Sequence, residues 1–139
     1  MILRLAICVV IYAGLGTAVQ AAPPQTDYML KCMGCHGPDG EAVTGKVPPL
    51  KDNVAKFLNV EGGRAFLVQV PGTRQSPLKD KAVADLLNWL VVHFDDAHVP
   101  ADFTPYTEAE VKALRRHRIG NVVTTRAALM QAVEARAAE

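Results

Sequence analysis

Apolar side chains recur at helical spacing along much of the chain, and this pattern predicts an all-helical protein. The clearest case is residues 78–94, LKDKAVADLLNWLVVHF. Here six apolar residues fall on one side of a helix: Val83, Leu86, Leu87, Leu90, Val91 and Phe94. Shorter helices are predicted over residues 52–58 and 64–70. The second of these should end at Pro71-Gly72, because proline and glycine stop helices.

Residues beyond Phe94 carry helix signals of their own. Thr107 and Glu110 have the spacing of a capping box, and Gly120 is expected to stop the helix that begins there. A further helix is predicted from about Thr125 to Ala138. Residues 97–139 are therefore expected to form a helical extension packed on the preceding domain.

The N-terminal 21 residues have the layout of a secretory signal peptide. Arg4 is followed by an apolar run over residues 5–15 and then by small residues that end at Ala21. The run is shorter than the roughly 20 residues that span a bilayer. We therefore expect cleavage after Ala21, loss of Cys8 with the leader, and no membrane span in the mature periplasmic chain. A retained membrane anchor is the alternative.

Composition limits what the rest of the chain can be. Its 139 residues with 50% hydrophobic content suffice for one ordinary core. The net charge of +1 lacks the basic imprint of a nucleic-acid-binding protein. We expect one compact domain and no nucleic-acid partner.

Residues 32–36, CMGCH, bring two cysteines and a histidine together. In an exported chain Cys32 and Cys35 would by default form a disulfide, but so short a loop is stabilised little by a crosslink. A redox dithiol of the thioredoxin kind requires a strand–helix–strand setting, and none flanks the motif. A zinc site requires four ligands, for which only His93 and His98 are near, at a spacing that fits loosely.

Covalent haem attachment explains the motif better than any of these alternatives. Two thiols three positions apart on a helical turn can add to two vinyl groups of one porphyrin. The adjacent histidine then reaches the iron from below. The motif predicts one haem c, with thioether bonds to Cys32 and Cys35 and with His36 as the proximal iron ligand.

From residue 26 to residue 94 the sequence resembles the small monohaem class I cytochromes c. Tyr28 lies one helical turn before Cys32, where the family's first helix carries an aromatic residue. CHGPDGEAVTGKVPPL resembles the family loop in which a proline carbonyl accepts a hydrogen bond from the proximal imidazole, and Pro48 has the equivalent spacing.

The resemblance implies an all-α, cytochrome c-like domain over residues 22–96, folded around the haem. Its last helix should cross the helix that carries Tyr28, with Trp89 packed at the crossing. Phe57 and Phe66 are expected to line the haem crevice.

The sequence departs from the family at the position of the axial methionine. The family usually carries this residue in the loop before the last helix, but residues 70–80 here read VPGTRQSPLKD. Met29 and Met33 lie on the attachment helix, beside the proximal side of the haem. The extension offers His98 and Met130 as weak candidates for the sixth ligand, and the third option is that no strong protein ligand exists.

Basic residues give two further expectations. Arg64 and Arg74 are potential partners of the haem propionates, although a solvent-facing position is the simpler expectation for each. The run from Lys112 to Arg118 is either a solvated helix face or a positive patch for an acidic redox partner.

These observations predict an electron carrier rather than an enzyme. The expected function is outer-sphere electron transfer in the periplasm, with a periplasmic dehydrogenase or oxidase as the partner class that the resemblance implies. The missing loop methionine supports an alternative, a five-coordinate haem protein that binds nitric oxide or carbon monoxide or reacts with peroxide. A third alternative is a permanent subunit of a larger enzyme, with the extension as its interface.

Overall fold

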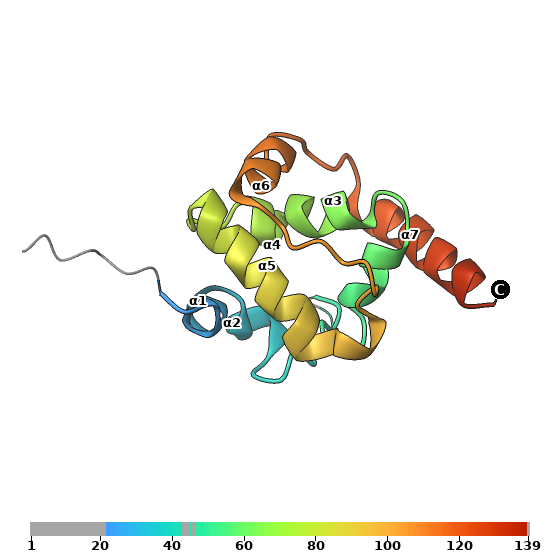
Figure 1. The fold of residues 1–139 in the computed structure, drawn as a ribbon, viewed down its shortest axis with the longest axis horizontal. Helices are drawn as coiled ribbons and strands as arrows, with labels where there is room; N and C mark the ends of the chain where they lie inside the picture. Colours follow the sequence, from blue (N-terminus) through green and yellow to red (C-terminus); the bar gives the residue numbers. More distant parts are fainter. Residues whose placement is uncertain (1–21, 43–44, 46, 139) are drawn as a thin grey trace, which may run out of the picture.

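A computed structural model describes residues 22–42, 45 and 47–138, and the expected signal peptide lies outside these residues. Within them the chain forms helices and loops without a strand, which confirms the all-α prediction (Figure 1). The elements in chain order are α1 (Pro24–Lys31), α2 (Met33–His36), the 3-10 helix η1 (Ala55–Asn59), α3 (Gly63–Gln69), α4 (Pro71–Arg74), α5 (Asp80–Asp95), the 3-10 helix η2 (Asp96–His98), α6 (Glu108–Leu114) and α7 (Val122–Ala137). No helix in the described ranges combines the length and the apolar character needed to cross a bilayer.

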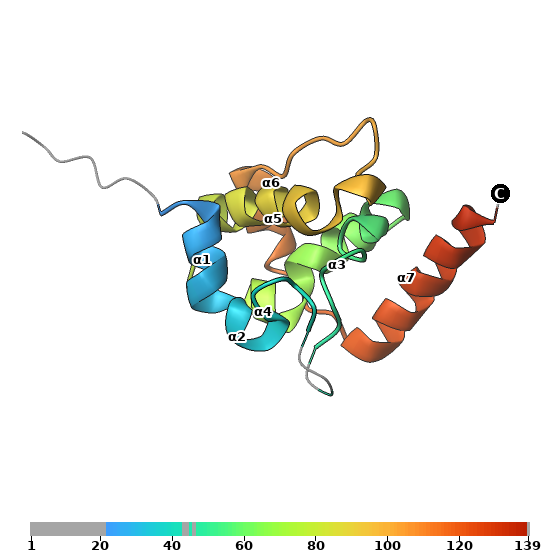
Figure 2. The same ribbon diagram turned by 90° about the horizontal axis from the view of Figure 1, so that it is seen from below.

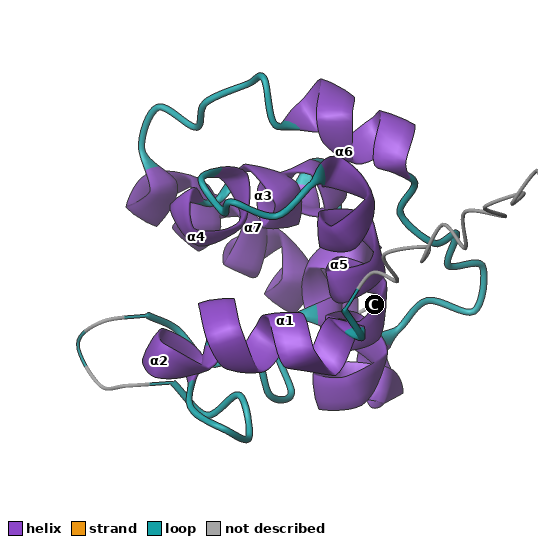
Figure 3. Cartoon of the chain, turned by 90° about the vertical axis from the view of Figure 1, so that its left-hand side faces the viewer, coloured by secondary structure: helices purple, strands orange, loops and turns teal. Residues whose placement is uncertain are grey.

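Helix α5 lies at the centre of the fold, and its apolar stripe is the centre of the core. All six apolar residues that define the stripe in the sequence are buried. Removing one such side chain from water contributes about 1.5–3 kcal/mol, so the stripe accounts for the position of this helix. Helix α1 packs on one part of α5, and α6 packs on another (Figures 1 and 3).

The crossing of α1 and α5 is made by aromatic side chains. The ring of Tyr28 lies 5.7 Å from that of Trp89 and 5.0 Å from that of Phe94, measured between centroids, with tilted planes. This confirms the predicted crossing and the packing role of Trp89.

The helix predicted over residues 52–58 begins later, as η1 at Ala55. Asp52 has a φ of 54°, which a helix cannot include, and its backbone N–H donates to the Phe94 carbonyl at 3.0 Å. This contact with the end of α5 holds the backbone of Asp52 outside the helix. Such a contact joins distant parts of the chain and leaves no signal in the local sequence.

Helix α3 ends as predicted before Pro71, but this proline has a second role that the sequence analysis missed. Val70 is extended, with φ −58° and ψ 144°, as a residue before proline usually is. Pro71 then starts α4, because a proline suits the first position of a helix, where its missing N–H is not needed.

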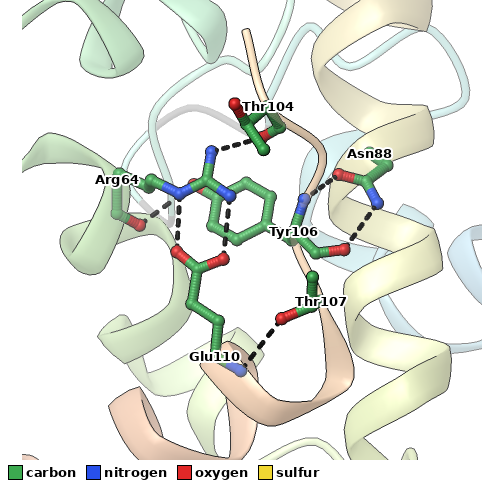
Figure 4. A network of polar contacts seen from close by, with 6 residues as sticks. All are labelled: Arg64, Asn88, Thr104, Tyr106, Thr107 and Glu110. Carbon is green, nitrogen blue, oxygen red and sulfur yellow. Dashed lines mark hydrogen bonds and ion pairs between the residues drawn. The ribbon is translucent and has the colours of Figure 1, made fainter.

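The extension contributes to the same core as the preceding helices. Tyr106 is 3% exposed and Val111 is fully buried. Asn88 of α5 holds the chain before α6 by two hydrogen bonds, from its Nδ2 to the Tyr106 carbonyl (3.0 Å) and from the Tyr106 N–H to its Oδ1 (2.7 Å) (Figure 4). The extension is thus packed on α5 and α3 by specific contacts.

Arg64 is neither solvent-facing nor free to bind a propionate, so the expectation of an exposed arginine was wrong. Its Nη2 donates to Glu110 Oε2 at 2.8 Å, and its Nη1 donates to the Thr104 carbonyl at 2.7 Å. The guanidinium carbon lies 3.9 Å from the centre of the Tyr106 ring (Figure 4). Glu110 therefore pairs with Arg64. Of the predicted capping box only one half forms, in which Thr107 Oγ1 accepts from the Glu110 N–H at 3.2 Å.

We expect Glu110→Gln to lower the free energy of unfolding at neutral pH by about 1–3 kcal/mol, because it leaves a half-buried guanidinium without its carboxylate. The hydrogen bond from Arg64 holds the pKa of Glu110 below its usual value of 4.5. The pair therefore stabilises the protein above the unfolded-state pKa, and this contribution is lost as the pH falls through the lower folded-state pKa.

Chemical denaturation of both proteins at several pH values tests this expectation. The difference between wild type and Glu110→Gln should shrink in acid. Glu108→Gln, at an exposed carboxylate of the same helix, serves as the control. A stability loss that is the same at every pH contradicts the expectation.

Gly120 does not stop α6, which already ends at Leu114. The chain turns away there, and the side chain of Arg115, the next residue, is held by the segment before α5. The predicted stop signal was therefore wrong, because a long-range contact ends the helix before glycine is reached.

Helix α7 begins three residues before the predicted position. Asn121 caps it, since its Oδ1 accepts from the N–H groups of Val123 (3.0 Å) and Thr124 (3.1 Å). No residue of α7 is fully buried, and the helix extends from the side of the molecule (Figure 2). Arg136 attaches its far end by donating to the Asn59 carbonyl of η1 at 2.9 Å.

Candidate functional site

The CMGCH motif forms one tight helical turn at the end of α1. Cys32 separates α1 from α2, and its carbonyl accepts from the N–H groups of both Cys35 and His36 at 3.0 Å. The turn brings the two thiols and the imidazole together within one short stretch. Both thiols are unpaired; Cys32 is half-buried and Cys35 is exposed.

The electrostatics of Cys32 do not suit a redox dithiol. Burial raises the pKa of this thiol to about 11, and the nearby Asp27 and Cys35 raise it further. A dithiol that reacts by thiol–disulfide exchange requires a thiolate with a lowered pKa. At neutral pH Cys32 is a protonated thiol.

The structure does not assemble the ligands of a zinc site. Within the described part of the chain, no three His, Cys, Asp or Glu side chains form a group that could hold a metal ion. His93 stacks on Trp89 at 4.3 Å between centroids, and His98 Nδ1 pairs with the Asp95 carboxylate.

The His36 imidazole is buried with an unsatisfied nitrogen. Its Nδ1 is inaccessible to solvent and has no hydrogen-bond partner. Burial lowers the pKa of His36, and the Pro48 carbonyl acts in the opposite direction. That carbonyl thus faces the imidazole, although the contact lacks the geometry of a full hydrogen bond. Buried polar atoms without a partner are rare, and each costs about 1–3 kcal/mol.

These features fit a haem iron ligand. A neutral imidazole is the form that binds a metal, and metal-bound histidines commonly present their second nitrogen to a carbonyl. In this chain the Pro48 carbonyl is placed to accept from Nδ1, which leaves Nε2 for the iron.

Tyr28 ties α1 to the residue that follows His36. Its hydroxyl is buried and donates to the Gly37 carbonyl at 2.5 Å. Burial raises the pKa of Tyr28 to about 12, and the nearby Cys32 and Glu41 raise it further, so the hydroxyl keeps its proton. The proximal side of the site is therefore fixed by a hydrogen bond as well as by the turn.

We expect Tyr28→Phe to lower the free energy of unfolding by about 1 kcal/mol, because the Gly37 carbonyl loses its donor. Guanidinium denaturation measures this loss. Met29→Leu, at an exposed position next to Tyr28, is a control that should unfold with wild type. Unfolding of Tyr28→Phe at the wild-type denaturant concentration contradicts the expectation.

The two candidate sixth ligands lie in different surroundings. His98 is held at the end of α5: its Nδ1 pairs with the buried Asp95 carboxylate, and its carbonyl accepts from Asn59 Nδ2 at 2.8 Å. Met130 is half-buried on the side of α7 that packs against the core, next to Leu129. His98 is thus an anchor of η2, and no pattern in the sequence pointed to its buried partner Asp95.

A cavity of about 320 Å³ adjoins the motif. Lys31, which directly precedes Cys32, lines one side of it. Residues of α4 and of the following loop line the other: Pro71, Gly72, Gln75, Ser76 and Pro77. This wall belongs to the segment from which the expected axial methionine is missing.

The chain is similar to two proteins of known identity. It is 33% identical over 107 residues to cytochrome c-552 of Thermus thermophilus, and the match covers 64% of this chain and 82% of that protein. It is also 33% identical over 107 residues to the cytochrome c-552 of a named strain of Thermus thermophilus, with coverage of 64% of this chain and 72% of that protein. No family model matches the chain.

Proposed function

The chain belongs to the small c-type cytochromes, and from this premise we propose that it transfers electrons between proteins of the periplasm. As a c-type cytochrome it is an electron carrier with one covalently bound haem c. The haem supplies a one-electron couple between ferric and ferrous iron.

In the proposed site, Cys32 and Cys35 form the two thioether bonds and His36 is the proximal iron ligand. The observation that carries this assignment is a buried imidazole with an unpartnered Nδ1, held in one turn with two unpaired thiols. The Pro48 carbonyl accepts from Nδ1, fixing the orientation of the ring and raising its basicity toward iron.

The remaining residues provide a rigid frame. Electron transfer requires little movement of the protein when the iron changes charge. Tyr28 fixes the proximal segment, while Tyr106 and Val111 join the extension to the same core. In this proposal residues 22–96 bind the haem, and residues 97–139 support that unit.

Localisation and partners follow from the expected leader. Export by residues 1–21 places the protein in the periplasm, where a dehydrogenase or an oxidase is the proposed partner. Of the basic run, Arg116 and Arg118 are exposed and available to an acidic surface. The side chain of Arg115 is only 16% exposed and is engaged within the molecule.

Spectroelectrochemical titration of the purified holoprotein tests the function. A carrier should show one reversible one-electron transition in its haem bands and should exchange electrons with a small redox protein without consuming peroxide. An irreversible titration, or turnover of peroxide at an enzymatic rate, contradicts the proposal.

A second function is favoured by a specific observation, the distal side of the site. The 70–80 segment has no methionine, and His98 Nδ1 is committed to Asp95. An iron without a sixth protein ligand would bind carbon monoxide rapidly in the ferrous state and would be high-spin in the ferric state. A low-spin protein that does not react with carbon monoxide would leave electron transfer as the only function.

A further inference from the structure

Arg115 uses all of its hydrogen-bond donors on one short segment of chain. A guanidinium has five N–H groups in a planar fork. Nε and Nη2 donate to the Arg74 carbonyl at 3.2 and 3.0 Å, and Nη2 also donates to the Ser76 carbonyl at 2.6 Å. Nη1 donates to the Leu78 carbonyl at 3.0 Å and to Asp80 Oδ1 at 2.8 Å.

These acceptors belong to the turn between α4 and α5, residues 74–80, here called the 74–80 segment. Three alternate carbonyls of this turn point at one side chain that comes from more than 30 residues further along the chain. A second contact runs in the opposite direction, since Arg74 Nε donates to the His117 carbonyl at 3.2 Å. The end of α6 and the 74–80 segment are thus joined from both sides.

The 74–80 segment is also a wall of the cavity beside the motif. Gln75, Ser76 and Pro77 line it opposite Lys31, the residue before Cys32. In this chain no methionine in the segment is present to tie it to the iron. A residue elsewhere in the chain must therefore determine the position of this wall relative to the attachment turn.

We propose that Arg115 is a positioning residue that holds the 74–80 segment as a wall of the haem crevice and thereby limits the access of external ligands to the iron. The inference rests on the proposed function, because it requires the haem beside the CMGCH turn. Lysine cannot replace arginine in this role, since an ammonium has three donors and lacks the planar fork that reaches three carbonyls and a carboxylate together.

The test compares the mature holoproteins of wild type, Arg115→Lys and Arg116→Lys. The second variant makes the same change at the exposed neighbour and is the matched control. Two quantities are measured: amide hydrogen exchange across the 74–80 segment, and the affinity of the ferric haem for added imidazole, followed by absorption.

For Arg115→Lys we expect exchange in the segment to rise by about tenfold or more, since local opening no longer breaks a fork of charge-assisted hydrogen bonds. Imidazole should bind several-fold more tightly or faster, while Arg116→Lys matches wild type in both measurements. Faster exchange with unchanged imidazole binding overturns the proposal, since Arg115 is then only a structural support. Unchanged exchange overturns it as well.

Asp80→Asn provides a second variant if Arg115→Lys does not accumulate as a folded holoprotein. It weakens one of the five contacts, so a smaller change in the same direction is expected, and no change in either measurement counts against the proposal. Failure of the proposed function is distinguishable, because it appears in wild type as a missing haem absorption before any variant is compared.

Discussion

Replacement of His36 by alanine is expected to abolish the proximal ligation of the iron while leaving the haem covalently attached. The two thioether bonds do not depend on the imidazole, but the iron loses the strongest ligand that the chain offers. The absorption spectrum should lose the features of a histidine-ligated haem in both oxidation states, and the reversible redox transition should disappear.

His93→Ala is the matched control, because His93 is an exposed histidine that stacks on Trp89. It should leave the spectrum and the redox transition unchanged. A His36→Ala protein with the wild-type spectrum would show that another residue is the proximal ligand.

Loss of both cysteines is expected to have the other large effect, complete loss of covalent haem attachment. In a Cys32→Ala, Cys35→Ala protein the haem should be extracted by acidified organic solvent, whereas in wild type it should remain with the chain. Cys35→Ala alone should impair attachment and leave a single thioether bond. Mass spectrometry under denaturing conditions measures each outcome.

Met33→Leu is the control for this pair, since Met33 lies in the same turn between the two cysteines and is not expected to bind the haem. It should retain one covalently bound haem. Covalent attachment that survives the loss of both cysteines would contradict the assignment of the thioether bonds.

The sequence was sufficient for the parts of the fold that depend on periodicity. The stripe on α5 predicts its own burial, and the buried Tyr28 and Trp89 meet where the resemblance to cytochromes places them. Periodicity works here because a helix with one apolar side has few ways to remove that side from water.

The errors arose where distant residues determine local structure. Arg64 pairs with Glu110, 46 residues away, and the Phe94 carbonyl holds Asp52 out of η1. Arg115 appeared to be one member of a basic run, although its side chain is directed into the molecule. The N-cap at Asn121 is different, since it is a local signal that could have been read from the sequence.

The site divides in the same way. The proximal side is written in five consecutive residues, so the motif alone predicts the thiols and the imidazole. The distal side depends on how the 74–80 segment and α7 fold back toward the core, and no spacing rule in the sequence selects between His98, Met130 and an open position.

The covalent haem is tested most directly by one measurement: the intact mass, together with the absorption spectrum, of the exported protein made in cells that attach haem to cytochromes. We predict a coloured protein whose mass equals that of the mature chain plus one haem. A colourless protein with the mass of the bare chain would contradict both the haem assignment and the function proposed from it.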